Sequence, residues 1–145
     1  MNEKYFEGLL ALLGAFLSFF LGGLDGLLKL LVVFAILDQI TGLMKSGVLH
    51  QWSSEVGFHG IAKKVCMFMF VGMANVIDKE MLSHFGHFDV LRDAVCMFYL
   101  ANEGLSIIEN AIAMGAPVPE GLKERFMTWR NKQLISKNKP EPDDE

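Results

Sequence analysis

The stretch Ala94–Met114 is long enough to cross a bilayer as one helix, yet it carries two glutamates and two asparagines. An α-helix turns about 100° per residue, so the face that each side chain occupies follows from its position. The polar residues fall within an arc of roughly 120°. We call this arc the polar stripe, and its residues are Tyr99, Asn102, Glu103, Ser106, Glu109 and Asn110. Arg92 lies on the same arc, and the opposite wall is apolar.

The energy of insertion limits what the polar stripe can face. A charged residue at mid-bilayer costs about 2.5–3.5 kcal/mol, whereas each leucine or isoleucine returns only about 0.3–0.6 kcal/mol. Glu103 and Glu109 therefore roughly cancel the apolar remainder of the helix. We expect the polar stripe to meet a partner helix, another subunit or water, so that it either lines a pore or joins helices.

The composition of the chain is that of a membrane protein. Hydrophobic residues make up 52% of it, and between Gly8 and Leu37 the charged side chains are Asp25 and Lys29 alone. No basic patch is interleaved with aromatic residues, so nucleic-acid binding has no support. These features predict an all-α integral membrane protein whose surroundings are membrane lipid.

Four segments have the pattern of membrane helices, at about residues 6–22, 26–44, 61–78 and 91–114. The glycine-rich segment Gly22–Gly26 between the first two predicts a tight turn and hence an N-terminal helical hairpin. The first apolar run, Gly8–Leu21, would be about 21 Å long against a hydrocarbon core of about 30 Å. We therefore prefer four transmembrane helices and keep three as the alternative.

The transmembrane helical domain is predicted to cover residues 1–116, and a C-terminal tail to cover residues 117–145. In the tail, Phe126 and Trp129 would anchor a short amphipathic helix, and the acidic tip has the composition of a disordered segment. With four spans, ten of the thirteen basic residues lie on the side of the C-terminus. The positive-inside rule therefore predicts a cytoplasmic tail.

Two further sets of residues are candidates for contacts between helices. Small residues at spacings of three and four let helix backbones approach closely, and in the first helix they are Gly8, Ala11, Ala15, Ser18 and Gly22. Polar residues inside the membrane need partners, and the candidates are Asp38, Lys64, Asn75, Asp78 and Arg92. They either bond between helices to fix one bundle or form a polar route with the polar stripe.

Catalytic and metal chemistry find little support in the sequence. Cys66 and Cys96 are isolated thiols in apolar stretches and are expected to be packing residues. His84 and His87 lie three residues apart, but no third metal ligand is in view. No nucleophile is placed beside a histidine, so we expect no enzyme activity, no metal and no cofactor.

Three segments resemble motifs of the phage holins that include the clostridial toxin-release holins. Leu37–Gly42 looks like their D-x-x-T-G segment, and Ser53–Lys64 matches the S-x-x-G-x-x-G-x-x-K-K pattern that follows. The strongest match runs from Arg92 to Lys123 and includes most of the polar stripe. The resemblance implies a multi-pass protein of the bacterial inner (cytoplasmic) membrane, usually with about three spans. Such a protein oligomerises into a lesion that releases a phage endolysin or a large toxin.

The leading hypothesis is thus a homo-oligomeric holin, through which an endolysin or toxin cargo passes without specific binding. One alternative is a small ion channel or transporter subunit of fixed stoichiometry, with Asp38, Glu103 and Glu109 as proton or cation sites. Another is a non-conducting membrane scaffold whose polar stripe only locks its bundle. Leakage of a folded protein marker separates the first from the second, and loss of membrane potential separates both from the third.

Overall fold

The computed structural model describes residues 3–51, 53–86 and 89–137 of the 145-residue chain, and within them it is entirely helical. The elements in chain order are α1 (Glu3–Leu21), α2 (Gly26–Val48), α3 (Ser54–Glu80), the short 3-10 helix η1 (Leu82–Phe85), α4 (Val90–Ala113) and α5 (Glu120–Lys137). The predicted all-α fold class is confirmed. The predicted acidic tip lies beyond the described residues.

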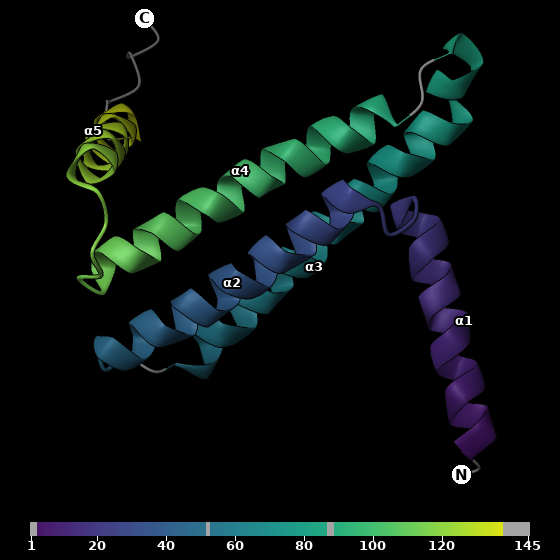
Figure 1. Ribbon diagram of the computed structural model, residues 1–145, viewed down its shortest axis with the longest axis horizontal. Coiled ribbons are helices and arrows are strands. Elements are labelled where there is room, and N and C mark those ends of the chain that lie inside the picture. Colours follow the sequence, from purple (N-terminus) through teal and green to yellow (C-terminus); the bar gives the residue numbers. More distant parts are fainter. Residues whose placement is uncertain (1–2, 52, 87–88, 138–145) are drawn as a thin grey trace, which may run out of the picture.

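Helices α2, α3 and α4 run side by side as a three-helix bundle, and α1 leaves the bundle at an angle from one end (Figure 1). The connection between α2 and α3 and the end of α4 lie at the opposite end of the bundle. Helix α5 follows α4 at that opposite end and is drawn apart from the bundle (Figure 1). In α5, Phe126 is buried and its ring lies beside that of Trp129, tilted by 43°, with 6.0 Å between the ring centroids.

The turn between α1 and α2 forms as the glycine-rich sequence predicts. Gly22 and Gly23 adopt φ values of 84° and 93°, a left-handed backbone that glycine takes at no steric cost. Asp25 then caps α2, since its Oδ1 atom accepts a 2.8 Å hydrogen bond from the Leu28 N–H. The predicted turn is therefore present, but α1 splays away from α2 and packs at its end against α3, so the two helices do not form the expected packed hairpin (Figure 1).

Helix α3 begins earlier than the sequence suggests, at Ser54 rather than near residue 61. Gly57 and Gly60 indicated a loop, but both lie within the first turns of α3. Ser53 has the extended backbone of an N-cap residue, with φ −141°. Gly60 packs against Gln39 of α2, so the absence of a side chain there lets the two helices approach. A tertiary contact thus outweighs the low helix propensity of glycine.

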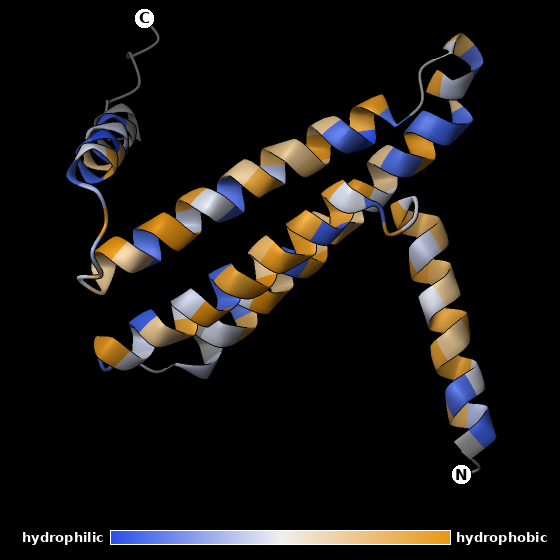
Figure 2. Ribbon diagram, in the orientation of Figure 1, coloured by the Kyte–Doolittle hydropathy of each residue, from blue (hydrophilic) through white to orange (hydrophobic). Residues whose placement is uncertain are grey.

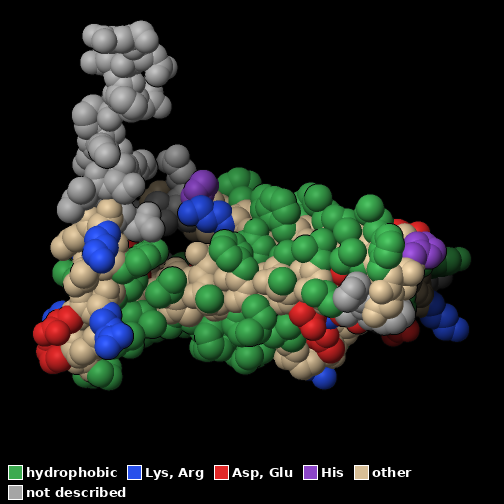
Figure 3. Space-filling view, turned by 90° about the horizontal axis from the view of Figure 1, so that it is seen from above, with side chains coloured by type: hydrophobic (Ala, Val, Ile, Leu, Met, Phe, Trp, Pro, Cys, Tyr) green, Lys and Arg blue, Asp and Glu red, His purple; other side chains and the backbone are tan. Residues whose placement is uncertain are grey.

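The interior of the bundle is small and its exterior is apolar. The core consists of Leu28, Leu31 and Ala35 of α2, Met67 and Val71 of α3 and Cys96 of α4. Large hydrophobic side chains are exposed along α1, α2, α3 and α4. The ribbon of Figure 2 shows that apolar residues recur along these helices, and hydrophobic side chains cover much of the face seen in Figure 3. An apolar exterior of this extent matches a lipid environment rather than water.

Among the described residues, three helical segments are long and apolar enough to cross a membrane, namely Lys4–Leu21, Gly26–Val48 and Gly57–Glu80. Helix α4 is not among them, although it packs along both α2 and α3. Its charged and amide side chains lower its hydropathy, as the insertion argument requires. Helix α4 therefore depends on α2 and α3 for the burial of its polar residues.

Candidate functional site

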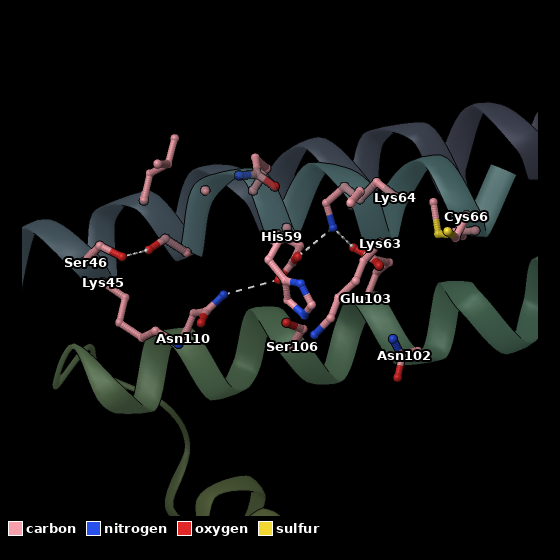
Figure 4. A pocket seen from close by; sticks show the side chains of 18 of the residues that line it. Lys45, Ser46, His59, Lys63, Lys64, Cys66, Asn102, Glu103, Ser106 and Asn110 are labelled. Carbon is pink, nitrogen blue, oxygen red and sulfur yellow. Dashed lines mark hydrogen bonds and ion pairs between the residues drawn. The ribbon is translucent and has the colours of Figure 1, made fainter. Parts of the chain in front are cut away.

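One ammonium group joins the three helices of the bundle. Lys64 Nζ of α3 lies 2.7 Å from Asp38 Oδ2 of α2 and 2.6 Å from Glu103 Oε2 of α4 (Figure 4). Each of the three side chains is at most 16% exposed, so the ions are largely shielded from the surroundings. We call this set the Lys64 triad. With two carboxylates and one ammonium, it carries a formal charge of −1 when all three groups are ionised.

Asn110 extends the Lys64 triad along the contact between α2 and α4. Its Nδ2 atom donates to Asp38 Oδ1 and to Thr41 Oγ1, both at 3.2 Å. The Thr41 hydroxyl donates in turn to the backbone oxygen of Asp38 at 3.0 Å. Asn110 follows Glu103 by about two helical turns, so both residues face α2 and α3. Glu103 and Asn110 thus hold the polar side of α4 against the bundle.

A second polar cluster, centred on Arg92, closes the other end of the bundle. The Arg92 guanidinium is buried, and it donates to the Leu21 carbonyl at 2.7 Å and to Asp25 Oδ2 at 2.6 Å. This ion pair and hydrogen bond hold the pKa of the Asp25 carboxyl below its usual range. Arg92 therefore ties α4 to the turn between α1 and α2.

Two side chains of α3 complete this end of the bundle. Asp78 accepts the backbone N–H groups of Leu91 at 3.1 Å and Arg92 at 2.7 Å, which caps α4 from a neighbouring helix. Asn75 donates to the carbonyls of Phe19 at 3.2 Å and Phe20 at 2.8 Å, which satisfies the end of α1. The five residues expected to need partners inside the membrane therefore all make hydrogen bonds to other segments.

The polar stripe does not have one environment. Arg92, Glu103 and Asn110 are buried at one edge of the arc, and Tyr99 and Ser106 are half-buried in its middle. The remaining two stripe residues, Asn102 and Glu109, are exposed at the other edge. Helical geometry places these groups at successive angles, roughly 40° apart. The exposure of the side chains in the polar stripe therefore increases from the edge that faces the bundle interior to the edge that faces outward.

The small residues of α1 have few neighbours within the chain. Ala11, Ala15 and Ser18 are exposed, and a methyl group added at Gly8 would meet nothing within 4 Å. Gly22 differs, because a side chain there would collide with Asn75 and Arg92. Helix packing through Gly8, Ala11, Ala15 and Ser18 thus stays a prediction, and it would require contact with another molecule.

A groove of about 750 Å³ opens between the helices beside the Lys64 triad. Tyr99, Asn102 and Ser106 of the polar stripe line it (Figure 4). The sequence reasoning did not identify several other lining residues, which are Lys45, Ser53, His59 and Lys63. The S-x-x-G-x-x-G-x-x-K-K pattern was the available signal for Lys63, which is one of its positions, and Ser53 directly precedes it.

Neither the two cysteines nor the described histidines belong to a cluster that could bind a metal ion. Cys96 is buried in the core, as a packing residue would be, whereas Cys66 is exposed and lines the groove. Among the described residues no group of three or more histidine, cysteine or acidic side chains is arranged to hold a metal ion. His87 lies outside the described residues.

Comparisons with known proteins give a consistent family. Residues 15–131 match the model of the bacteriophage holin family. An uncharacterized protein of Listeria monocytogenes is 42% identical over 130 residues, which cover 90% of each chain. A probable holin of Bacillus phage phi105 is 36% identical over 99 residues, or 68% of this chain and 70% of the phage protein. An uncharacterized 14.9 kDa protein of Clostridium perfringens is 34% identical over 83% of this chain and 89% of its own. No solved structure shows a significant match.

Proposed function

Because this chain belongs to the bacteriophage holin family, we propose that it oligomerises in the bacterial inner membrane and opens a large non-specific lesion. An endolysin or a protein toxin leaves the cell through this lesion without binding to it specifically. The proposed action involves no catalytic step, because the lesion forms by rearrangement of the chains within the membrane. The two exposed residues of the polar stripe carry this proposal.

Asn102 and Glu109 project from a helix whose other exposed side chains are mostly apolar, such as Met97 and Phe98. A carboxylate and an amide are costly when they face hydrocarbon, because lipid offers no hydrogen-bond partner. Both side chains are exposed in the described chain, Asn102 in the lining of the groove and Glu109 outside that lining. A second copy of α4 or a water-filled space would satisfy them, and both arise when chains assemble around a pore.

The buried edge of the polar stripe supports a closed state of the single chain. Glu103 and Asn110 are already satisfied by Lys64, Asp38 and Thr41. The chain therefore accumulates as a folded bundle in which Asn102 and Glu109 are the residues of the polar stripe left exposed. Assembly would bring these residues together, and wetting of the assembled ring would expose the rest of the polar stripe. The polar stripe would thus be satisfied in two states, one packed inside the bundle and one facing water in the assembled ring.

The basic residues support an orientation with the C-terminus in the cytoplasm. Lys45 lies in the last turn of α2, at the end of the bundle where α5 begins, and α5 is itself rich in lysine and arginine (Figure 1). The other end holds Lys29, Lys79 and Arg92, and the Arg92 guanidinium is paired with Asp25. The positive-inside rule places the more basic end in the cytoplasm.

The test replaces each exposed stripe residue by leucine, as Asn102→Leu and Glu109→Leu. Phe98→Leu is the matched control, because Phe98 is exposed on the same helix and already apolar. Each variant is expressed at equal level, and the release of a folded cytoplasmic protein is timed. We expect the two stripe variants to reach the membrane fraction but to release the marker late or never, while the control releases it on time.

Unchanged release by both stripe variants would refute a pore-lining or assembly role for these residues. Loss of membrane potential without release of the folded marker would instead indicate a narrow ion channel. If expression of the wild-type chain neither abolishes the membrane potential nor releases the folded marker protein, the chain is a non-conducting scaffold and the proposed function is wrong.

A further inference from the structure

The groove beside the Lys64 triad has the character of an anion site. It lies between α2, α3 and α4 and has a volume of about 750 Å³, within the usual range of small-molecule sites. Gly57 and Gly60 contribute no side chains to its wall, so the backbone of α3 is accessible there. The groove is therefore large enough for a polar headgroup and open toward one end of α3.

Cationic and donor groups from three helices converge on this space. Figure 4 shows Lys63 and His59 of α3 reaching toward Ser106 of α4, while Lys45 extends from α2 toward Asn110. Neither Lys45 nor Lys63 forms an ion pair with any described side chain. Their charges are thus available to a ligand that enters the groove.

The acidic residues of the groove do not cancel these charges. Asp38 and Glu103 both accept from Lys64, and Asp38 also accepts from Asn110. Their oxygen atoms are therefore directed at partners within the bundle. Taking the described lysines and acids of the lining together, three cations face two carboxylates, and two of the three cations are outside the Lys64 triad.

The start of α3 adds a further attraction for an anion. Ser53 occupies the N-cap position and lines the groove, but its side chain makes no capping hydrogen bond. The first N–H groups of a helix lack partners within the helix and carry a partial positive charge. An oxyanion bound near Ser53 would accept from these groups, at the end of the groove about 15 Å along α3 from Lys63.

From this convergence we propose that the groove binds an anionic phosphate group, carried either by a phospholipid headgroup or by a free phosphate. Lys45 and Lys63 supply charge-assisted hydrogen bonds, and Ser106 supplies a neutral donor. Binding would join α2, α3 and α4 at the end of the bundle that the proposed orientation places at the cytoplasmic surface. The inference does not depend on lesion formation, because it concerns a single folded chain.

The test measures binding to the full chain in a detergent with an uncharged headgroup. The probes are dihexanoyl phosphatidylglycerol, dihexanoyl phosphatidylcholine and sodium phosphate, each titrated by isothermal calorimetry. The double variant Lys45→Ser/Lys63→Ser removes the two unpaired groove cations. Lys123→Ser/Lys132→Ser is the matched control, since it removes the same charge from α5 outside the groove. Protection of the buried Cys96 thiol checks that every variant is folded.

We expect the groove variant to bind phosphatidylglycerol about tenfold more weakly than the wild type, and the α5 variant to bind it normally. Tight binding of phosphatidylglycerol with weak binding of sodium phosphate assigns the site to a lipid headgroup. Equal binding of both anions assigns it to free phosphate. Equal losses in the groove and α5 variants, or equal affinity for the zwitterionic phosphatidylcholine, would overturn the proposal. Neither outcome bears on the proposed lesion, which is tested by marker release.

Discussion

The Lys64 triad allows a prediction in which the charge balance decides the result. Replacing Lys64 by methionine keeps the apolar stem of the side chain and removes only the ammonium group. Asp38 and Glu103 would then face each other without a cation, and the formal charge of the site would change from −1 to −2. Replacing Glu103 by glutamine has the opposite effect, because it leaves one ammonium with one carboxylate.

The size of each effect follows from burial. All three side chains are at most 16% exposed, so water screens the unpaired carboxylates little. Removing one partner of a buried ion pair costs about 3–5 kcal/mol. Glu103→Gln keeps an oxygen that accepts from Lys64, so its cost is under about 1 kcal/mol. The two substitutions thus differ by several kcal/mol although both remove the ion pair at the same 2.6 Å contact.

The assay uses the buried Cys96 thiol as a reporter of opening. In a Cys66→Ser background Cys96 is the only thiol, and it reacts with a small reagent only when the bundle opens. Lys64→Met is expected to raise the labelling rate by roughly two to three and a half orders of magnitude, and Glu103→Gln by less than about tenfold. The triple variant Asp38→Asn/Lys64→Met/Glu103→Gln should label more slowly than Lys64→Met alone.

Comparable labelling of the Lys64→Met and Glu103→Gln variants would refute the charge-balance reasoning. It would mean that the geometry of the contact, and not the uncompensated charge, determines stability. Lys29→Met is the control, because Lys29 is an exposed lysine of α2 outside the Lys64 triad.

Two other predictions concern the attachment of α1 and its turn to the bundle. A methyl group at Gly72 would overlap the Phe20 ring, so Gly72→Ala should destabilise the folded chain by about 1–3 kcal/mol, seen as a lower midpoint in detergent unfolding. Gly14→Ala, where the added methyl group meets nothing within 4 Å, should leave the midpoint unchanged or raise it. Arg92 lowers the pKa of Asp25, so the stabilisation from this pair is complete above about pH 5 and is lost as the pH falls through the lowered pKa. The difference in unfolding free energy between the wild type and Asp25→Asn should therefore be constant near neutral pH and shrink in acid, and a difference that grows in acid would contradict the pairing.

The sequence predicted the features that depend on neighbouring residues. The turn at Gly22–Gly26 forms because its glycines accept a left-handed backbone and Asp25 caps the next helix. The apolar runs form helices of membrane length because their side chains demand an apolar exterior. The start of α3 was placed too late, because the contact of Gly60 with Gln39 is made across 21 positions of sequence and leaves no local signal.

Only part of the candidate site could be predicted from the sequence in the same way. Periodicity placed Asn102, Glu103 and Glu109 on one arc of α4, and the three do share that arc. It did not say which edge of the arc meets the bundle, because the rotation of a helix about its axis is set by its neighbours. Asp25 was assigned to a turn, and its pairing with Arg92 was not foreseen, since 67 positions separate them.

The sequence alone therefore determined the helical class, the apolar exterior, the turn and the family resemblance, all of which depend on local composition and spacing. Tertiary structure decided that Glu103 and Asn110 are satisfied inside the chain while Asn102 and Glu109 are left exposed. The physical reason is that a helix fixes the angles between its own side chains, whereas the packing of α4 on α2 and α3 fixes what those angles face.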